Sequence, residues 1–196
     1  MIERILAFWH MPPIFQRDHK KMAAVASAHG NVKGLVTHTD VDGTGMHVVI
    51  VKTRWNEAVI AALVRGAQEK IAACGATSEV VEVPGSYEVV YAARRIIASK
   101  RRDGKRIDAV VCIGCLIKGE TMHFEYICEA VTQGIMKLNF EGDVPVIFGV
   151  LACMTEDQAL ARAGLENASG KKHNHGPEWG QSALEMAILR RNFPVQ

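Results

Sequence analysis

Apolar residues recur along this chain in two alternating patterns, short apolar runs and longer stretches with helical spacing. The runs cover residues 47–52, 79–83, 108–117 and 145–151, and they predict four β-strands. After each run, apolar residues return every three or four positions, as expected for an amphipathic helix. Strands that alternate with helices indicate one parallel sheet with crossover helices.

Two of the predicted helices have well-marked apolar stripes. The first begins near Asn56 and ends at Gly75, and its stripe consists of Val59, Ile60, Leu63, Val64, Ala67 and Ile71. The other follows a loop at 118–122, and its stripe consists of Phe124, Ile127, Cys128, Val131, Ile135 and Leu138. The run at 108–117 is almost continuously apolar, which is typical of a central strand buried on both faces.

The remaining boundaries follow from local signals. Pro84-Gly85 ends the second strand, and a helix over about 87–99 comes next. Thr155 and Gln158 have the spacing of a capping box, which predicts a helix to about Ala163. A loop over 164–180 then leads to a last helix ending near Arg191. With right-handed crossovers, the fold class is a three-layer α/β/α sandwich around a four-stranded parallel sheet.

Residues 1–45 show no sustained periodicity, and Pro12, Pro13 and several glycines interrupt them. We therefore expect two regions, an N-terminal extension outside the core at 1–45 and one folded domain at 46–196. The basic run at 100–106 surrounds Asp103-Gly104 and is interpreted as a solvated turn between a helix and a strand.

Composition excludes several classes of protein. The 23 basic and 21 acidic side chains nearly balance, so we expect no strong attraction for nucleic acid or anionic lipid. No apolar stretch reaches the roughly 18 residues that cross a bilayer. The five cysteines are odd in number and scattered, which favours a reducing compartment over a disulfide framework. We expect a cytoplasmic location.

Ligands of such sheets bind beyond the carboxyl ends of the strands. That rule selects four segments, which are 53–56, 84–88, 115–123 and the end of the fourth strand around Phe148. The loop at 118–121 runs into a helix whose first N–H groups favour a phosphate, although an ordinary turn has the same pattern. It lacks the glycine–lysine pattern of a nucleotide triphosphatase and the three glycines of a dinucleotide site.

Four side chains in these segments are candidates for chemistry. His123, in the first turn of that helix, is placed for proton transfer near neutral pH, with a purely structural contact as the alternative. Trp55 could stack on a flat heterocycle or cap the edge of the sheet. Ser86 and Glu88 offer a hydroxyl and a carboxylate, or they simply begin a helix.

Metal and redox sites are not expected. Cys112 and Cys115 are three positions apart on a strand, so they point to opposite faces and cannot share a metal or a disulfide. His173 and His175 lie in the late loop without a zinc-type pattern of cysteines or carboxylates around them.

Taken together, the four segments resemble the lumazine synthase family. The resemblance covers about residues 46–191, and its four motifs follow four successive strands in order: Thr53-Arg54-Trp55-Asn56, Val83-Pro84-Gly85-Ser86-Tyr87-Glu88, Lys118-Gly119-Glu120-Thr121-Met122-His123-Phe124-Glu125-Tyr126 and Pro145-Val146-Ile147-Phe148-Gly149-Val150. It implies a flavodoxin-like fold and the condensation of 5-amino-6-(D-ribitylamino)uracil with 3,4-dihydroxy-2-butanone 4-phosphate in riboflavin biosynthesis. The family needs neither a cofactor nor a metal for this reaction.

The resemblance also assigns roles to residues. His123 matches the catalytic histidine, Glu120 and Thr121 match the phosphate-binding turn, and Arg162 matches the arginine that holds the phosphate. The residues that would line the pyrimidine and ribityl pocket are Trp55, Ser86, Tyr87, Glu88, Cys115, Leu116 and Ile117. In the family, Phe148 and Arg162 reach a site formed mainly by the adjacent subunit.

The segment 165–179 is longer than in shell-forming members and resembles the pattern of pentameric, notably fungal, ones. We therefore expect a homopentamer rather than a sixty-subunit capsid. The sequence also allows two other interpretations of the function. The chain could be a flavin- or lumazine-binding protein without catalysis, since Trp55 could stack on riboflavin, or a purely structural shell protein.

Overall fold

The four predicted strands form one sheet in which every pairing is parallel, and its strand order is β2-β1-β5-β6. The computed structural model describes residues 38, 40–99, 101–102 and 105–194, so the predicted extension at 1–45 falls largely outside the described residues. The strands lie within two residues of their predicted bounds: β1 His47–Thr53, β2 Thr77–Val83, β5 Ala109–Ile117 and β6 Val146–Cys153.

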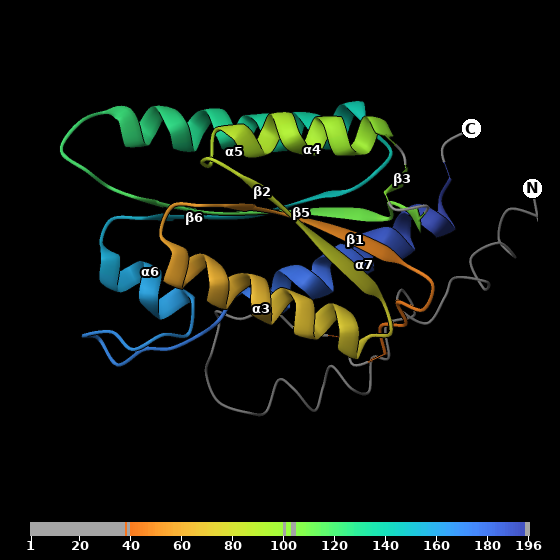
Figure 1. The fold of residues 1–196 in the computed structure, drawn as a ribbon, viewed down its shortest axis with the longest axis horizontal. Coiled ribbons are helices and arrows are strands. Elements are labelled where there is room, and N and C mark those ends of the chain that lie inside the picture. The colour runs from red at the N-terminus through yellow and green to blue at the C-terminus, as the bar shows by residue number, and fades with distance from the viewer. Residues whose placement is uncertain (1–37, 39, 100, 103–104, 195–196) are drawn as a thin grey trace, which may run out of the picture. The chain divides into compact units, whose positions relative to one another are not determined.

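Helices cover both faces of this sheet, which confirms the predicted three-layer α/β/α arrangement. Figure 1 shows α4 and α5 on one side and α3, α6 and α7 on the other. Their bounds are α3 Glu57–Ala73, α4 Glu88–Ser99, α5 His123–Glu141, α6 Glu156–Arg162 and α7 Gly176–Asn192. No helix in the described part of the chain is long and apolar enough to cross a membrane.

The two layers of helices explain the continuous apolar runs of the central strands, Val48–Val51 in β1 and all of β5. Val48 and Ile50 of β1 pack in the core beneath α3 and α7, whereas Val49 and Val51 pack beneath α4 and α5. The same alternation divides the buried residues of β5. A strand covered on both faces buries the side chains of successive residues, which produces a continuous apolar run along its middle.

Helix α5 departs from the predicted stripe in its first two turns. Val131, Ile135 and Leu138 are buried as predicted, but Phe124 and Ile127 are only partly buried. These two side chains line a cavity instead of packing fully into the core. The beginning of α5 is therefore open on the side where the sequence predicts ligand chemistry.

Helix α7 begins earlier than predicted, at Gly176 rather than after Gly180. Pro177 is compatible with the first turn of a helix, and the two glycines pack against the backbone of α3. A Cβ atom at Gly176 would lie 2.1 Å from the Leu63 carbonyl oxygen, and one at Gly180 would lie 2.7 Å from the Ala67 carbonyl oxygen. Glycine at 176 and 180 permits close packing of α7 on α3, so the prediction that both residues lie in a loop was wrong.

Two smaller features refine the prediction. The basic run forms a two-stranded antiparallel hairpin from β3 Arg101–Arg102 and β4 Lys105–Arg106, and its predicted turn at 103–104 lies outside the described residues. At the start of α6 the Thr155 hydroxyl accepts a hydrogen bond from the Gln158 N–H, as predicted. The Gln158 side chain accepts from the N–H of Met154 rather than from that of Thr155.

The close packing of α3 and α7 yields a test. We expect Gly176→Ala to lower the free energy of unfolding by about 2 kcal/mol or more, because the Leu63 backbone cannot move away cheaply. Gly119→Ala is the matched control, since a Cβ atom there meets nothing within 4 Å. Urea unfolding monitored by circular dichroism measures both variants, and equal midpoints would show that the α3–α7 contact is looser than described.

Candidate active site

The carboxyl ends of the parallel strands meet at one edge of the sheet, and a cavity of about 740 Å³ lies there. It opens where β1 and β5 lie side by side and their connections leave in opposite directions, to β2 and to β6. Segments that follow three different strands line it: Trp55, Asn56, Gly85, Ser86, Tyr87, Glu88, Cys115, Leu116, Ile117, Gly119, Thr121, His123, Phe124 and Ile127.

Nine of the predicted site residues line this cavity, and they are Trp55, Ser86, Tyr87, Glu88, Cys115, Leu116, Ile117, Thr121 and His123. Glu120 lies between two lining residues, Gly119 and Thr121. Phe148 and Arg162, at the end of α6, do not line it. The prediction that Phe148 ends the fourth strand was wrong, because β6 runs on to Cys153 and Phe148 lies near its start. The structure therefore brings together the predicted heterocycle pocket and helix start, but not the two residues expected to serve a neighbouring subunit.

One wall of the cavity carries an exposed aromatic ring. The Trp55 side chain is 72% exposed. It lies beside the turn after β2, because a Cβ atom at Gly85 would be 3.5 Å from the Trp55 Cδ1 atom and 3.1 Å from a Glu88 carboxylate oxygen. An exposed indole at a cavity wall offers a flat surface for a planar ligand.

The opposite part of this turn is buried against β5. Ser86 is buried, and a Cβ atom at Gly114 would lie 2.7 Å from its hydroxyl oxygen. Glycine at 114 thus lets the turn after β2 lie directly on the central strand. The Ser86 hydroxyl is held at the cavity by this contact.

Asn56 lies in the predicted segment 53–56 and begins the predicted helix, but it was not among the predicted site residues. Its backbone is left-handed, with φ 58°, and its side-chain amide donates a hydrogen bond of 3.0 Å to the Cys115 carbonyl. Asparagine tolerates this conformation better than most residues, which was the available signal. The contact ties the end of β1 to the end of β5 at the cavity.

The loop before α5 leaves the first N–H groups of that helix at the cavity mouth. Met122, the N-cap residue of α5, makes no capping hydrogen bond with its side chain. The His123 N–H donates to the Thr121 hydroxyl at 3.4 Å. His123 is exposed and lines the cavity, so its imidazole can reach a ligand. Uncapped N–H groups and the helix dipole favour an anion at this position.

Lys118, the cation at the start of this loop, is paired with a carboxylate. Its ammonium group forms an ion pair with Glu125 and lies 5.7 Å from the centre of the Phe124 ring. The hydrogen bond from Lys118 holds the pKa of Glu125 below its usual value. Among the described residues that line the cavity, none is lysine or arginine. A bound phosphate would therefore need a cation from elsewhere.

The cysteines follow the predicted geometry and add one contact. Cys112 packs beneath α4 and α5 and Cys115 beneath α3 and α7, which confirms that they point to opposite faces. Cys115 instead faces Cys153 on the neighbouring strand β6, and all five cysteines are free. The hydrogen bond between these thiols lowers the pKa of Cys153 to about 7 and raises that of Cys115.

In the loop before α7, the side chains of His173 and His175 both contact Glu178. The premise that no carboxylate surrounds this histidine pair was therefore wrong. Glu178 is only three residues from His175, but the late loop was expected to extend through it, so its position on the first turn of α7 was missed.

Comparison with known proteins agrees with this geometry. A model of the 6,7-dimethyl-8-ribityllumazine synthase family matches residues 45–191. The chain belongs to this family. Its activity is that of a lumazine synthase in riboflavin biosynthesis, as the order of its four motifs predicted. The described core of the chain, from β1 to α7, falls almost entirely within the matched range.

Individual relatives carry the same family name. The chain is 38% identical over 186 residues to the 6,7-dimethyl-8-ribityllumazine synthase of Pyricularia oryzae. This alignment covers 78% of the chain and 92% of that protein. It is 42% identical over 154 residues to that of Schizosaccharomyces pombe, covering 76% and 91%. Against the Flavobacterium psychrophilum enzyme it is 38% identical over 169 residues, covering 85% and 84%.

The left-handed turn at Asn56 can be tested by two substitutions that both remove the bond to Cys115. We expect Asn56→Ala to be less stable than Asn56→Gly by about 1 kcal/mol, because only glycine adopts φ 58° without strain. Thermal unfolding of the two variants side by side measures this difference. If alanine proved as stable as glycine, the turn would not be left-handed in solution.

Proposed function

We propose that the cavity binds 5-amino-6-(D-ribitylamino)uracil and that the start of α5 binds the phosphate of 3,4-dihydroxy-2-butanone 4-phosphate. The observation that carries this proposal is the placement of an exposed indole, a helix N-terminus and a histidine around one cavity. A flat heterocycle, a phosphate and a proton-transfer group are what the condensation has to bring together.

The pyrimidine would stack on the exposed face of Trp55. The Glu88 carboxylate lies beside that indole at Gly85 and can accept hydrogen bonds from the ribityl chain. The buried Ser86 hydroxyl lines the same cavity and can accept or donate them. Leu116 and Ile117 line the cavity at the end of β5, where backbone groups of the strand offer further hydrogen bonds.

The phosphate would lie at the turn of Gly119, Glu120 and Thr121, where the first N–H groups of α5 and the Thr121 hydroxyl can donate hydrogen bonds. This placement brings the ketone of the four-carbon substrate toward the 5-amino group of the pyrimidine. His123 lines the cavity and begins α5, so it would stand between the two subsites.

The chain's contribution to the reaction is orientation and proton transfer. The 5-amino group attacks the ketone, and a first water leaves as the imine forms. Loss of a proton from the neighbouring carbon then expels phosphate, and the second amine closes the ring on the remaining carbonyl carbon with loss of a second water. The His123 imidazole takes up and returns protons during these steps. Holding both substrates in one cavity converts a meeting of two molecules into a step within one complex.

Assembly into a homopentamer would complete the site. The cavity has no lysine or arginine among its described lining residues, and Arg162 and Phe148 lie outside it. Large apolar side chains are exposed on and beside α4 and α5, including Tyr87, Tyr91, Tyr126 and Phe140. Such a surface favours contact with another protein surface. Arg162 of one subunit would supply the cation that the phosphate turn of the next subunit lacks.

Two further expectations belong to this proposal. The extension outside the catalytic domain would end before Val41 rather than at 45, because Val41 is buried in the core with residues of α3 and α7 and the Gly43 N–H donates to the Cys74 carbonyl. The family match begins at residue 45. The protein acts in the cytoplasm, where five free cysteines are stable.

His123 provides the first test of this proposal. We expect His123→Ala to lower kcat by about 100-fold while the Kd of the pyrimidine changes little, because the imidazole transfers protons and the stacking surface is intact. Gln133→Ala, an exposed change on the same helix, is the control. Steady-state kinetics and pyrimidine titration separate the two effects, and an unchanged kcat would remove His123 from the reaction.

Shared sites between subunits provide the second test. His123→Ala and Arg162→Ala chains, each nearly inactive alone, should regain roughly a quarter of the wild-type activity after unfolding and joint refolding, since a head-to-tail assembly rebuilds some intact sites. Refolding each variant by itself is the control. If the mixed assembly stays as inactive as its parents, Arg162 serves the site of its own chain and the proposed arrangement is wrong.

A further inference from the structure

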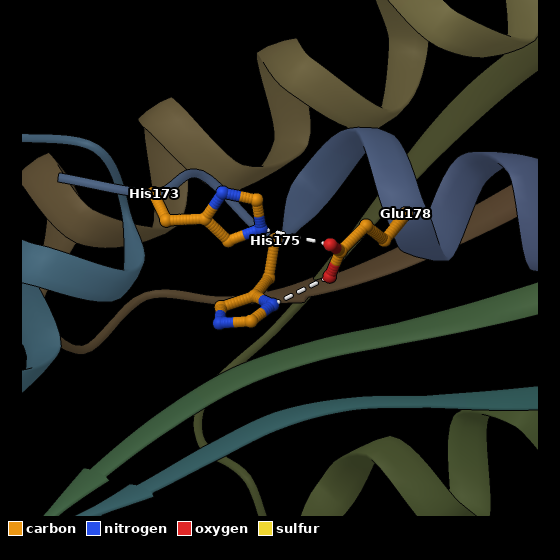
Figure 2. A group of neighbouring side chains, drawn as sticks. All are labelled: His173, His175 and Glu178. Atoms are coloured by element: carbon orange, nitrogen blue, oxygen red, sulfur yellow. Dashed lines mark hydrogen bonds and ion pairs between the residues drawn. The ribbon is translucent and has the colours of Figure 1, made fainter. Parts of the chain in front are cut away.

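Three side chains with metal-binding atoms converge at the start of α7, outside the cavity. Figure 2 shows the imidazoles of His173 and His175 directed at the two oxygens of one carboxylate, that of Glu178. The His173 Nε2 atom lies 2.8 Å from one oxygen, and the His175 Nδ1 atom lies 2.6 Å from the other. The donor atoms all lie within 4.8 Å of one another.

The backbone holds the two histidines on the same side of their segment. The N–H groups of His173 and His175 donate hydrogen bonds to the carbonyls of Ala161 and Arg162, at 2.8 and 3.1 Å. Asn174 between them forms a β-bridge with Ala163. Side chains at alternate positions of an extended segment point the same way, so the imidazoles at 173 and 175 share one side.

The side chain of Asn174 anchors this segment to two helices. Its amide nitrogen donates to the Ala62 carbonyl of α3 at 2.9 Å, and its amide oxygen accepts from the Gly176 N–H at the start of α7 at 2.8 Å. The cluster is therefore built on packed elements, because Gly176 itself lies against the α3 backbone. A preformed donor set needs little rearrangement to take up an ion.

The third ligand, Glu178, is held on the first turn of α7. Burial opposes its ionisation, but the hydrogen bonds from His175 and His173 outweigh burial and lower its pKa. Its carboxylate is 24% exposed, and the His173 side chain is 63% exposed, so an ion can enter from solvent. His175 is fixed further by stacking on Trp179, with ring centres 6.1 Å apart.

We propose that His173, His175 and Glu178 bind a divalent transition-metal ion, with Zn²⁺ as the expected occupant and water as the fourth ligand. Two imidazoles and one carboxylate are a common ligand set for this ion. Ligand atoms around a tetrahedral ion lie about 3.4 Å apart at bond lengths of about 2.1 Å. The two present hydrogen-bond distances would therefore open slightly, and the widest separation among the donor atoms, which is within 4.8 Å, would close.

The ion would join the loop at 163–175 to α7 without taking part in the condensation. Its direct effect would be on Arg162, whose carbonyl accepts the hydrogen bond from His175. Binding would thus steady the end of α6, where the arginine with the proposed phosphate role lies. The metal site itself stands independently of that role.

The test is zinc binding by the full chain, free of any affinity tag, measured by calorimetric titration with Zn²⁺ as the sole ligand. We expect the wild type to bind one more Zn²⁺ per chain than Glu178→Gln does, or to bind it about 100-fold more tightly. His173→Asn should show the same loss, and its exposed position makes misfolding an unsuitable explanation. Far-UV circular dichroism verifies the fold of both variants.

Glu166→Gln is the matched control. This glutamate lies in the same loop but pairs with Lys172, so its loss should leave zinc binding unchanged. Visible absorption of Co²⁺ adds a second readout, because a tetrahedral site gives the wild type and the control intense bands that both site variants lack. Equal zinc binding and equal cobalt spectra in the wild type and Glu178→Gln would overturn the proposal, as would a wild type that binds no zinc.

Discussion

Parallel pairing of four strands is the constraint on which the remaining structure depends. Because β1, β2, β5 and β6 all run in one direction, the segments after them emerge at the same edge of the sheet. Residues as far apart in sequence as Trp55, Ser86 and His123 therefore line one cavity. The pairing itself needs helices on both faces, which is why β1 and β5 are apolar on both sides.

The charges around the start of α5 bear on whether a single chain completes the proposed phosphate site. The start of α5 offers N–H groups to an anion, but Lys118 is paired with Glu125, and no lysine or arginine is among the described residues that line the cavity. Phosphate carries more negative charge than a helix terminus balances. In the proposed assembly, Arg162 of a neighbouring subunit would lie beside this turn and resolve the imbalance, and the exposed apolar side chains near α4 and α5 suit such a contact.

Much of this fold could be predicted because its signals are local. Continuous apolar runs marked the strands, and the rule for carboxyl ends then selected the segments that hold Trp55 and His123. What could not be predicted depends on contacts between distant segments. The pair of Cys115 and Cys153 requires the register of β5 and β6, and the cluster around Glu178 requires the early start of α7. Glycines at 176 and 180 suggested a loop, because their close approach to α3 has no local signal.

Product formation by the purified chain, supplied with both substrates, is the direct measure of its lumazine synthase activity. Lumazine fluorescence and released phosphate should rise together, in equal amounts and over many turnovers, and neither should appear when one substrate is omitted. A chain that binds the pyrimidine or a flavin in its cavity, yet releases no phosphate and forms no lumazine, would contradict the account.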